Sequence, residues 1–299
     1  MAAGDRVQPS LRAPVAGAVP GVLPAAEPEV ADVEVALKSL SQWQLAARRF
    51  RRHHLALIGT AIFGFMLVVA ILAPIVAPFD TLNYPGAIKP GGDAPSLSHI
   101  FGTDRDGRDV FGMVINGARI SMAVGIFSTL IAGFTGVLLG SIAGYVGGIV
   151  DNVIMRVVDV LFAIPFLFVI LVAARFFGQG QVSSIILIFG FLSWPLIARL
   201  VRASFLSLRE ADFVDAARAV GVSNSRITFR HILPNALGPV IVAMTLLTSS
   251  NIVLEAFVSF LNFGIKETDV SWGNALANAQ NSLSLGNWWW AFFPGMSIA

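Results

Sequence analysis

The segment EADFVDAARAVGVSNSRITFRHILPN, residues 210–235, is a polar stretch of the chain between two strongly apolar segments. Four of its apolar residues have the spacing i, i+3, i+4 and i+7 of a single helix face: Phe213, Ala216, Ala217 and Val220. Gly221 suits the end of that helix, Ser223 the N-cap of a second short helix, and Pro234 the first turn of the next apolar segment. The pattern predicts a compact pair of helices that either enters a partner's groove or folds onto its own protein.

The chain has the composition of a membrane protein. Of its 299 residues, 56% are hydrophobic and 13% are charged, whereas soluble domains carry about 25% charged residues. Five apolar segments approach or exceed the roughly 20 residues that a spanning helix needs: residues 55–79, 120–146, 157–174, 184–201 and 234–263. A sixth apolar segment, residues 288–299, extends only about 18 Å at a rise of ~1.5 Å per residue, too short for a hydrocarbon core of about 30 Å. We therefore expect an all-α polytopic fold in which the sixth span is truncated at the C-terminus.

Basic residues predict the orientation of these spans. Four arginines stand directly before the first span: Arg48, Arg49, Arg51 and Arg52. Because such residues stay on the cytoplasmic side, we expect the N-terminus and residues 202–233 inside the cell and residues 80–119 outside. The expected organisation is a flexible cytoplasmic tail over residues 1–46, a first span with an external loop over 47–119, and a core transmembrane domain over 120–299.

Several kinds of site are excluded by the residues present. The chain has no cysteine, and its four histidines lack the spacing of a helical metal site. No phosphate-binding glycine loop precedes a lysine, and the basic residues are too dispersed for a nucleic-acid surface. The aspartates around Gly107 resemble a calcium loop, but Met113 stands where such a loop needs Glu. We therefore expect no metal, no cofactor, no catalytic group and no nucleic-acid partner.

The second span carries glycines at four-residue intervals: Gly136, Gly140 and Gly144. Residues four apart lie on one face of a helix, so these glycines form a groove that a second helix can approach closely. The groove serves either plain packing within the membrane or movement of one helix along another. The sequence does not separate these two roles.

Three ionisable residues are expected within the spans or at their ends: Arg156, Asp159 and Glu255. Charges in a membrane are costly, so each needs an explanation. The i, i+3 spacing of Arg156 and Asp159 predicts an ion pair between them. Glu255 lies toward the outer part of the fifth span, where it either pairs with a polar group of a neighbouring helix or faces a water-filled path.

The segment Asp215-Ala216-Ala217, with Gly221 four residues on and Leu233-Pro234 beyond it, resembles the EAA loop of ABC-importer permeases. Asp215 stands where that family often has Glu. Further segments resemble the C-type permease subunit of dipeptide, oligopeptide and nickel importers: FRRHHLALIG (50–59), GTDRDGRDVFG (102–112), GARIS (117–121), DNVIMRVVDVLFAIPF (151–166), RHILPN (230–235) and LEAFVSFLNFG (254–264). The resemblance extends over about residues 47–299.

The resemblance implies a six-span permease of the bacterial inner membrane that forms half of a translocation pathway for peptides or similar small solutes. Its implied partners are a B-type permease subunit, two cytoplasmic ATPase subunits and a periplasmic or lipid-anchored solute-binding protein. ATP hydrolysis would belong to those partners, so the chain itself is not expected to be an enzyme. The implied coupling helices cover about residues 207–231, and Ala217 is expected to let them settle into a partner's groove. The implied ATPase-coupling residues are Glu210, Phe213, Asp215, Ala216, Ala217, Gly221, Leu233 and Pro234.

The chain departs from the family in one respect, because the family completes a sixth span whereas this sequence stops at Ala299. Peptide is favoured over nickel as the substrate, since His99 alone offers no metal site outside the membrane. Two other functions stay open. An ion-coupled secondary transporter would need inverted repeats, which the sequence does not show, and a membrane scaffold would recruit a cytoplasmic enzyme through residues 210–235.

Overall fold

The computed structural model describes residues 48, 50–77, 92–178, 180–266, 269–280 and 286–299. The predicted tail over residues 1–46 lies outside these residues. The chain divides into two compact units, Met1–His53 and His54–Ala299. Everything that follows concerns the second unit.

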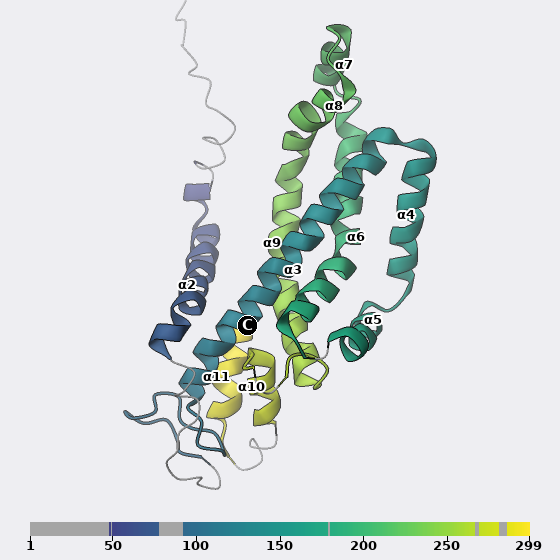
Figure 1. Ribbon diagram of the computed structural model, residues 1–299. Coiled ribbons are helices and arrows are strands. Elements are labelled where there is room, and N and C mark those ends of the chain that lie inside the picture. The colour runs from purple at the N-terminus through teal and green to yellow at the C-terminus, as the bar shows by residue number, and fades with distance from the viewer. Residues whose placement is uncertain (1–47, 49, 78–91, 179, 267–268, 281–285) are drawn as a thin grey trace, which may run out of the picture. The chain divides into compact units, whose positions relative to one another are not determined.

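The described part of the second unit is helical, with a single bridge between Thr103 and Asp109 and no strand (Figure 1). The helices in chain order are α2 (His54–Val76), α3 (Val110–Val146), α4 (Gly148–Ala163), α5 (Phe166–Ala173), α6 (Val182–Leu208), α7 (Asp212–Ala219), α8 (Asn224–Arg226), α9 (Leu233–Phe260), α10 (Trp272–Ala279) and α11 (Trp289–Ile298). Two π-helical turns, η2 (Ala174–Gly178) and η3 (Ile227–Ile232), interrupt the α-helical order.

Among the described residues, four helices are long and apolar enough to cross a membrane: His54–Val76, Val110–Val146, Val182–Leu208 and Asn224–Phe260. A fifth span is possible if the bent pair Gly148–Ala163 and Phe166–Phe177 counts as one. The expectation of an all-α polytopic fold is therefore confirmed. The second span begins at Val110, well before the predicted residue 120, because Asp109 caps α3 by accepting the N–H of Phe111 at 3.3 Å.

The segment predicted as a span over residues 157–174 does not form one continuous helix. The chain bends by 86° between α4 and α5. Ile164 takes an extended conformation with φ −92° and ψ 134°, as residues before a proline tend to do. Pro165 then provides no N–H to continue the helix, so the apolar segment folds as two helices instead of one.

The expectation of two separate short helices after residue 210 is also wrong. The second of them, α8, runs through η3 directly into α9. In η3 the N–H of Leu233 bonds to the carbonyl of Thr228, one residue further back than in an α-helix. Pro234 follows, and its ring would clash with the carbonyl four residues earlier. The wider π turn makes room for that ring, so the helix continues through the proline.

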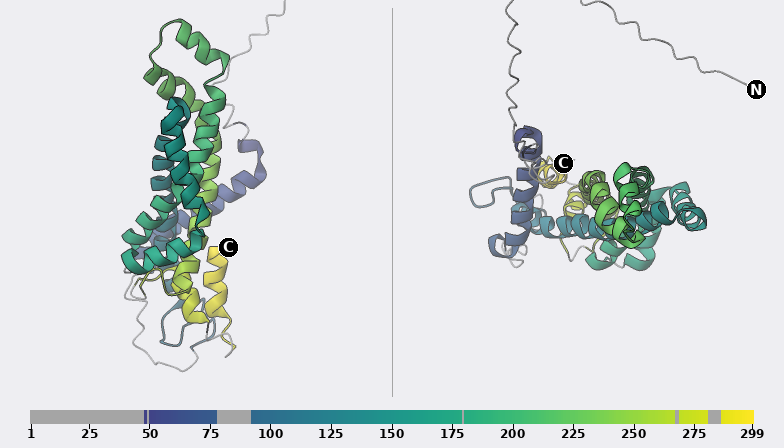
Figure 2. Two further views of the ribbon diagram at one scale, coloured as in Figure 1. Left: turned by 90° about the vertical axis from the view of Figure 1, so that its right-hand side faces the viewer. Right: turned by 90° about the horizontal axis from the view of Figure 1, so that it is seen from above.

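The two ends of the unit are different in construction. At the α7 end, α6 stops and α8 leads into α9, so that α7 projects beyond the helix bundle (Figure 1). At the α10 end lie α5, α10, α11 and the segment before α3. The left view of Figure 2 shows the same order after a turn of 90°. The long helices α3, α6 and α9 join the two ends.

Buried side chains connect the long helices with both ends. One cluster joins α6 to the α7 end through Phe205, Val214 and Ile227. At the other end, α2 packs on the first half of α3, where Asn116 Nδ2 donates to the carbonyl of Ala77 at 2.8 Å. The outer faces of α2, α4 and α5 carry exposed large apolar side chains, as expected for surfaces that meet lipid or another membrane subunit.

Candidate functional site

Helix α7 has two apolar faces. Val214 and Ala217 are buried against the rest of the chain, and Ala217 is only 8% exposed. Phe213, Ala216 and Val220 point outward, with Val220 79% exposed. The predicted single face is therefore wrong at Ala217, which packs inward into a buried cluster that includes Val214 and Ile227. The outward face that remains belongs to residues 213, 216 and 220.

Gly221 ends α7 with a hydrogen-bond pattern that needs a left-handed residue. Its φ is 76°, its N–H bonds to the carbonyl of Arg218 at 3.0 Å, and the N–H of Val222 bonds to the carbonyl of Ala217 at 3.0 Å. This is the Schellman arrangement, in which glycine avoids the strain of a side chain. Ser223 occupies the N-cap of α8, but its hydroxyl makes no capping hydrogen bond, so its predicted capping role is wrong.

The remaining residues of the implied coupling set lie around α7. Glu210 is exposed and lies 3.7 Å from Arg209, and Asp215 pairs with Arg218 at 2.9 Å on the surface. Such exposed pairs contribute about 0–1 kcal/mol each. Leu233 is half-buried and Pro234 is exposed. The α7 end therefore presents a small apolar face with charges beside it.

The three glycines of α3 lie against α6. A Cβ at Gly136 would stand 2.6 Å from the Cβ of Ile197, and one at Gly140 would stand 2.6 Å from the carbonyl oxygen of Ala198. At Gly144 it would stand 2.5 Å from the Cβ of Phe205. No real Cβ tolerates such distances, so the two backbones approach each other more closely than any side chain permits. We call this contact the α3–α6 seam.

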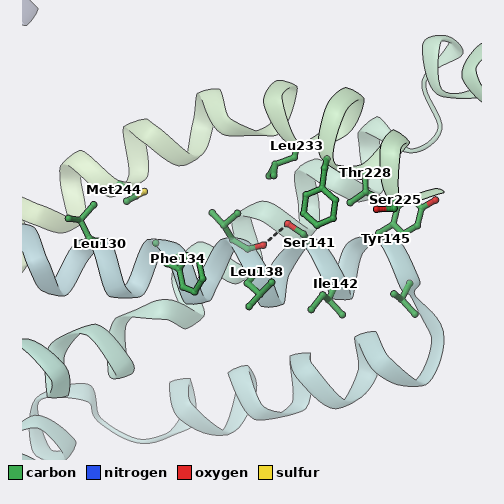
Figure 3. A pocket seen from close by; sticks show the side chains of 14 residues that line it. Leu130, Phe134, Leu138, Ser141, Ile142, Tyr145, Ser225, Thr228, Leu233 and Met244 are labelled. Atoms are coloured by element: carbon green, nitrogen blue, oxygen red, sulfur yellow. Dashed lines mark hydrogen bonds between the residues drawn. The ribbon is translucent and has the colours of Figure 1, made fainter. Parts of the chain in front are cut away.

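On its other side, α3 faces η3 and α9 across open space. A cavity of about 620 Å³ lies between them near the α7 end (Figure 3). Leu130, Phe134 and Met244 line one part of it and Tyr145, Ser225 and Thr228 the other. The Ser141 hydroxyl donates to the carbonyl of Val137 in its own helix, so it does not reach across. We call this space the α3–α9 groove.

Helix α4 is attached to α6 by two ion pairs. Arg202 donates from Nε and Nη2 to the two carboxylate oxygens of Asp151, at 2.5 and 2.6 Å. Arg199 donates to Asp159 at 2.5 Å and lies over the ring of Phe162. The predicted pair between Arg156 and Asp159 is therefore wrong, because Asp159 turns to α6. Within the described residues Arg156 makes no ion pair and is exposed.

Glu255 is buried among hydroxyl groups. Its carboxylate accepts from Ser121 Oγ of α3 and from Ser259 Oγ of α9, both at 2.8 Å. Ser121 Oγ also accepts the N–H of Trp272 at 3.3 Å, and Ser259 Oγ that of Ile265 at 3.3 Å. Glu255 is predicted either to pair with a polar group of a neighbouring helix or to face a water-filled path. In the structure it pairs with Ser121 of α3. The glutamate holds α3, α9 and the start of α10 together.

The α10 end closes over a tight loop. Asp104 Oδ1 accepts the N–H groups of Asp106 and Arg108 at 2.9 and 2.7 Å, and burial raises the pKa of Asp104. The indole N–H groups of Trp289 and Trp290 both donate to the carbonyl of Thr103.

Among the described residues, no group of three or more His, Asp or Glu could hold a metal ion.

Comparisons with known proteins agree with this architecture. A family model described as the binding-protein-dependent transport system inner membrane component matches residues 136–299. A second, described as the N-terminal TM domain of oligopeptide transport permease C, matches residues 41–90.

Individual relatives cover most of the chain. The dipeptide transport system permease protein DppC of Bacillus subtilis is 36% identical over 261 residues, which are 87% of this chain and 81% of the relative. The oligopeptide transport system permease protein OppC of Escherichia coli K12 is 38% identical over 261 residues, 86% of this chain and 85% of the relative. The chain belongs to the family of inner-membrane permease components of binding-protein-dependent transport systems, as its resemblance to ABC-importer permeases predicted.

Proposed function

We propose that this chain is the C-type permease subunit of an ATP-driven peptide importer. The relatives named above are dipeptide and oligopeptide permeases, which supports peptides as the solute. The chain forms half of the translocation pathway beside a B-type permease, with two cytoplasmic ATPase subunits and an external solute-binding protein. The spans α2, α3, α4–α5, α6 and α8–α9 are the first five of six, and α11 begins the sixth.

The charges support an orientation with the α7 end in the cytoplasm. Six arginines lie between the second half of α6 and η3: Arg199, Arg202, Arg209, Arg218, Arg226 and Arg230. By the positive-inside rule these stay in the cytoplasm. The N-terminus is then cytoplasmic, and α10, α11 and residues 92–109 face the solute-binding protein.

Labelling tests this orientation without a background signal, because the chain has no cysteine. Ala94 and Ser223 are both exposed and lie at opposite ends of the unit. A cysteine at residue 94 should react with an impermeant thiol reagent in intact cells, and one at residue 223 only after the membrane is opened. Reaction at residue 223 in intact cells would reverse the orientation.

The outward face of α7 is the single observation that carries the coupling proposal. Phe213 and Val220 are 40% and 79% exposed on the same side of this segment, and an apolar face among charged residues supports a partner that covers it. The inner face of the same helix is fixed by Val214 and Ala217. Movement of a bound ATPase would therefore pass from residues 213, 216 and 220 through this buried base into α6 and α9.

Replacing Val220 by Arg tests the proposal at a position that is 79% exposed, so little native packing is lost. We expect the V220R variant to insert, to assemble with the partner permease and to lose binding of the ATPase subunits at least tenfold. The matched control is Leu97→Arg, an exposed leucine at the opposite end, which should bind the ATPases normally. Ala217→Arg is less informative, since it would damage the chain's own core.

Two readouts decide the outcome. Purified complexes are assayed for bound ATPase and, after reconstitution, for hydrolysis stimulated by a peptide-loaded binding protein. If Val220→Arg retains both, the outward face of α7 is not the coupling surface.

A further inference from the structure

A second cavity lies where α4 and α5 separate. It has a volume of about 370 Å³ and is walled by the bend between those helices on one side and by α6 and α9 on the other. Its lining is mostly apolar, with three polar side chains, Ser193, Ser250 and Asn251. We call it the bend cavity. The coupling surface on α7 does not involve it.

Ser193 has a hydroxyl without a partner. The residue is 6% exposed, and its Oγ is the one buried side-chain polar atom in the described part of the chain that makes no hydrogen bond. Elsewhere in the same helix, Ser204 Oγ bonds back to the carbonyl of Leu200. A buried hydroxyl normally finds a partner, so the one on Ser193 is available to a group that enters the cavity.

Asn251 contributes an acceptor. Both hydrogen bonds formed by its amide leave from Nδ2, to Ser128 Oγ at 2.9 Å and to Thr129 Oγ1 at 3.2 Å. These two bonds from Asn251 in α9 to hydroxyl groups of α3 fix the orientation of the amide. The carbonyl oxygen Oδ1 keeps its acceptor capacity.

The bend supplies a further acceptor from the backbone. In a continuous helix the carbonyl of Leu161 would accept the N–H of residue 165, but Pro165 has none. Both residues line the cavity. Irregular backbone at membrane depth is tolerated where it is buried in protein or lines a cavity.

With the start of α6 at the edge of the hydrocarbon, the cavity would lie near the middle of the membrane. Ser193 follows the start of α6 at Val182 by about 16 Å, at a rise of ~1.5 Å per residue, and the hydrocarbon core is about 30 Å thick. A solute that crosses the membrane must pass this depth. In secondary transporters, half-helix ends at the midplane commonly hold the solute.

The available groups define the ligand. The oxygens of Leu161 and Asn251 can only accept, the hydroxyls of Ser193 and Ser250 can do both, and no charged side chain lines the cavity. We propose that the bend cavity binds one residue of the transported peptide, taking its apolar side chain into the cavity and its backbone N–H onto these oxygens. The volume lies in the range of small-ligand pockets. This inference rests on the proposed peptide transport.

Uptake by the complete importer tests the polar contact. The probe is the tripeptide Ala-Leu-Ala, compared with the same peptide N-methylated at leucine, which has no N–H there. Ser193→Ala should raise KM for the plain peptide roughly 2- to 10-fold, the range of one hydrogen bond, and leave KM for the methylated peptide unchanged. The control Ser204→Ala removes a hydroxyl that is already bonded within its own helix and should change neither value.

Crosslinking tests occupancy without requiring transport. Phe166 lines the cavity and is 41% exposed, whereas Phe168, two residues on, does not line it and is 68% exposed. Each is replaced by p-benzoylphenylalanine in the full complex, which is irradiated with radiolabelled Ala-Leu-Ala. We expect labelling from position 166 that excess unlabelled peptide removes, and none from position 168.

The outcomes separate the two proposals. Peptide uptake without specific crosslinking at position 166, together with an unchanged KM in Ser193→Ala, would overturn the bend cavity and leave peptide transport standing. Specific crosslinking without uptake would support the cavity and count against the proposed import. Absence of both uptake and crosslinking would overturn both.

Discussion

Helix α3 meets its two main neighbours in opposite ways. Against α6 it presents Gly136, Gly140 and Gly144, and the backbones approach until no Cβ would fit. Against α9 it is tight where Gly125 lies on Ile252 and where Gly133 lies on the side chain of Met244. Toward the α7 end the same pair of helices opens into the α3–α9 groove of about 620 Å³ (Figure 3).

The difference separates a fixed contact from one that has room to change. The α3–α6 seam has no space for a shift across it, so these helices are expected to move as one body. The α3–α9 groove leaves free volume beside η3, the π-helical turn that connects α8 with α9. If the ATPases move α7, α9 can respond by closing the groove, while α3 and α6 stay together.

The largest effect is expected from breaking the seam with Gly140→Leu. A side chain there would meet the backbone of Ala198, which cannot move aside as a flexible side chain would. Overpacking of this kind costs about 1–3 kcal/mol or more, so we expect loss of folded protein and of assembly with the partner permease. Yield and thermal midpoint in detergent measure it. Gly64→Leu is the control, because no atom lies within 4 Å of a Cβ at that site in α2, and an equal loss there would contradict the seam.

A smaller effect is expected from detaching α4. Asp151→Asn leaves the partly buried Arg202 without its bidentate partner and should cost roughly 1–3 kcal/mol. Asp159→Asn removes a pair whose side chains are half exposed and should cost about 0–1 kcal/mol. Thermal unfolding of both variants measures the difference. A double variant with Arg202→Gln should recover part of the first loss, and additive losses would show that the two residues act independently.

The smallest effect on stability is expected from Ser141→Leu, which changes the residue beside Gly140 on the groove side of α3. The cavity has room for the larger side chain, so the thermal midpoint should shift by less than that of Gly140→Leu. Transport should nevertheless fall severalfold if α9 closes the groove during the cycle. Normal uptake by a stable Ser141→Leu protein would show that the groove is not used for movement.

Much of this architecture could be predicted from local sequence. Apolar segments and arginine placement identify the spans, and the positive φ of Gly221 follows from its place after a helix. The single face of α7 could not be predicted correctly, because spacing alone does not say which side of a short helix the rest of the chain covers. Ala217 and Val220 share a helix, yet one is buried and the other exposed.

The long-range contacts lay beyond the reach of local spacing. Spacing along the sequence predicts a pair between Asp159 and Arg156, whereas the partner of Asp159 in the structure is Arg199, 40 residues away. Local spacing does not predict the pair of Asp151 and Arg202, which are 51 residues apart. The sequence signal for it is that both are charges beside apolar segments. Pro165 is the sequence signal for the bend between α4 and α5. The apolar residues on both sides of it favour one continuous span instead.

The ion pairs between α4 and α6 also have a consequence for biosynthesis. α4 emerges from the ribosome before α6, so Asp151 and Asp159 reach the insertion machinery before Arg202 and Arg199 exist. An unpaired aspartate costs up to roughly 2.5–3.5 kcal/mol on insertion scales, with the full cost at the centre of a nascent span. The α4–α5 segment is therefore expected to enter the bilayer poorly when translated alone, and to settle there only once α6 has been synthesised.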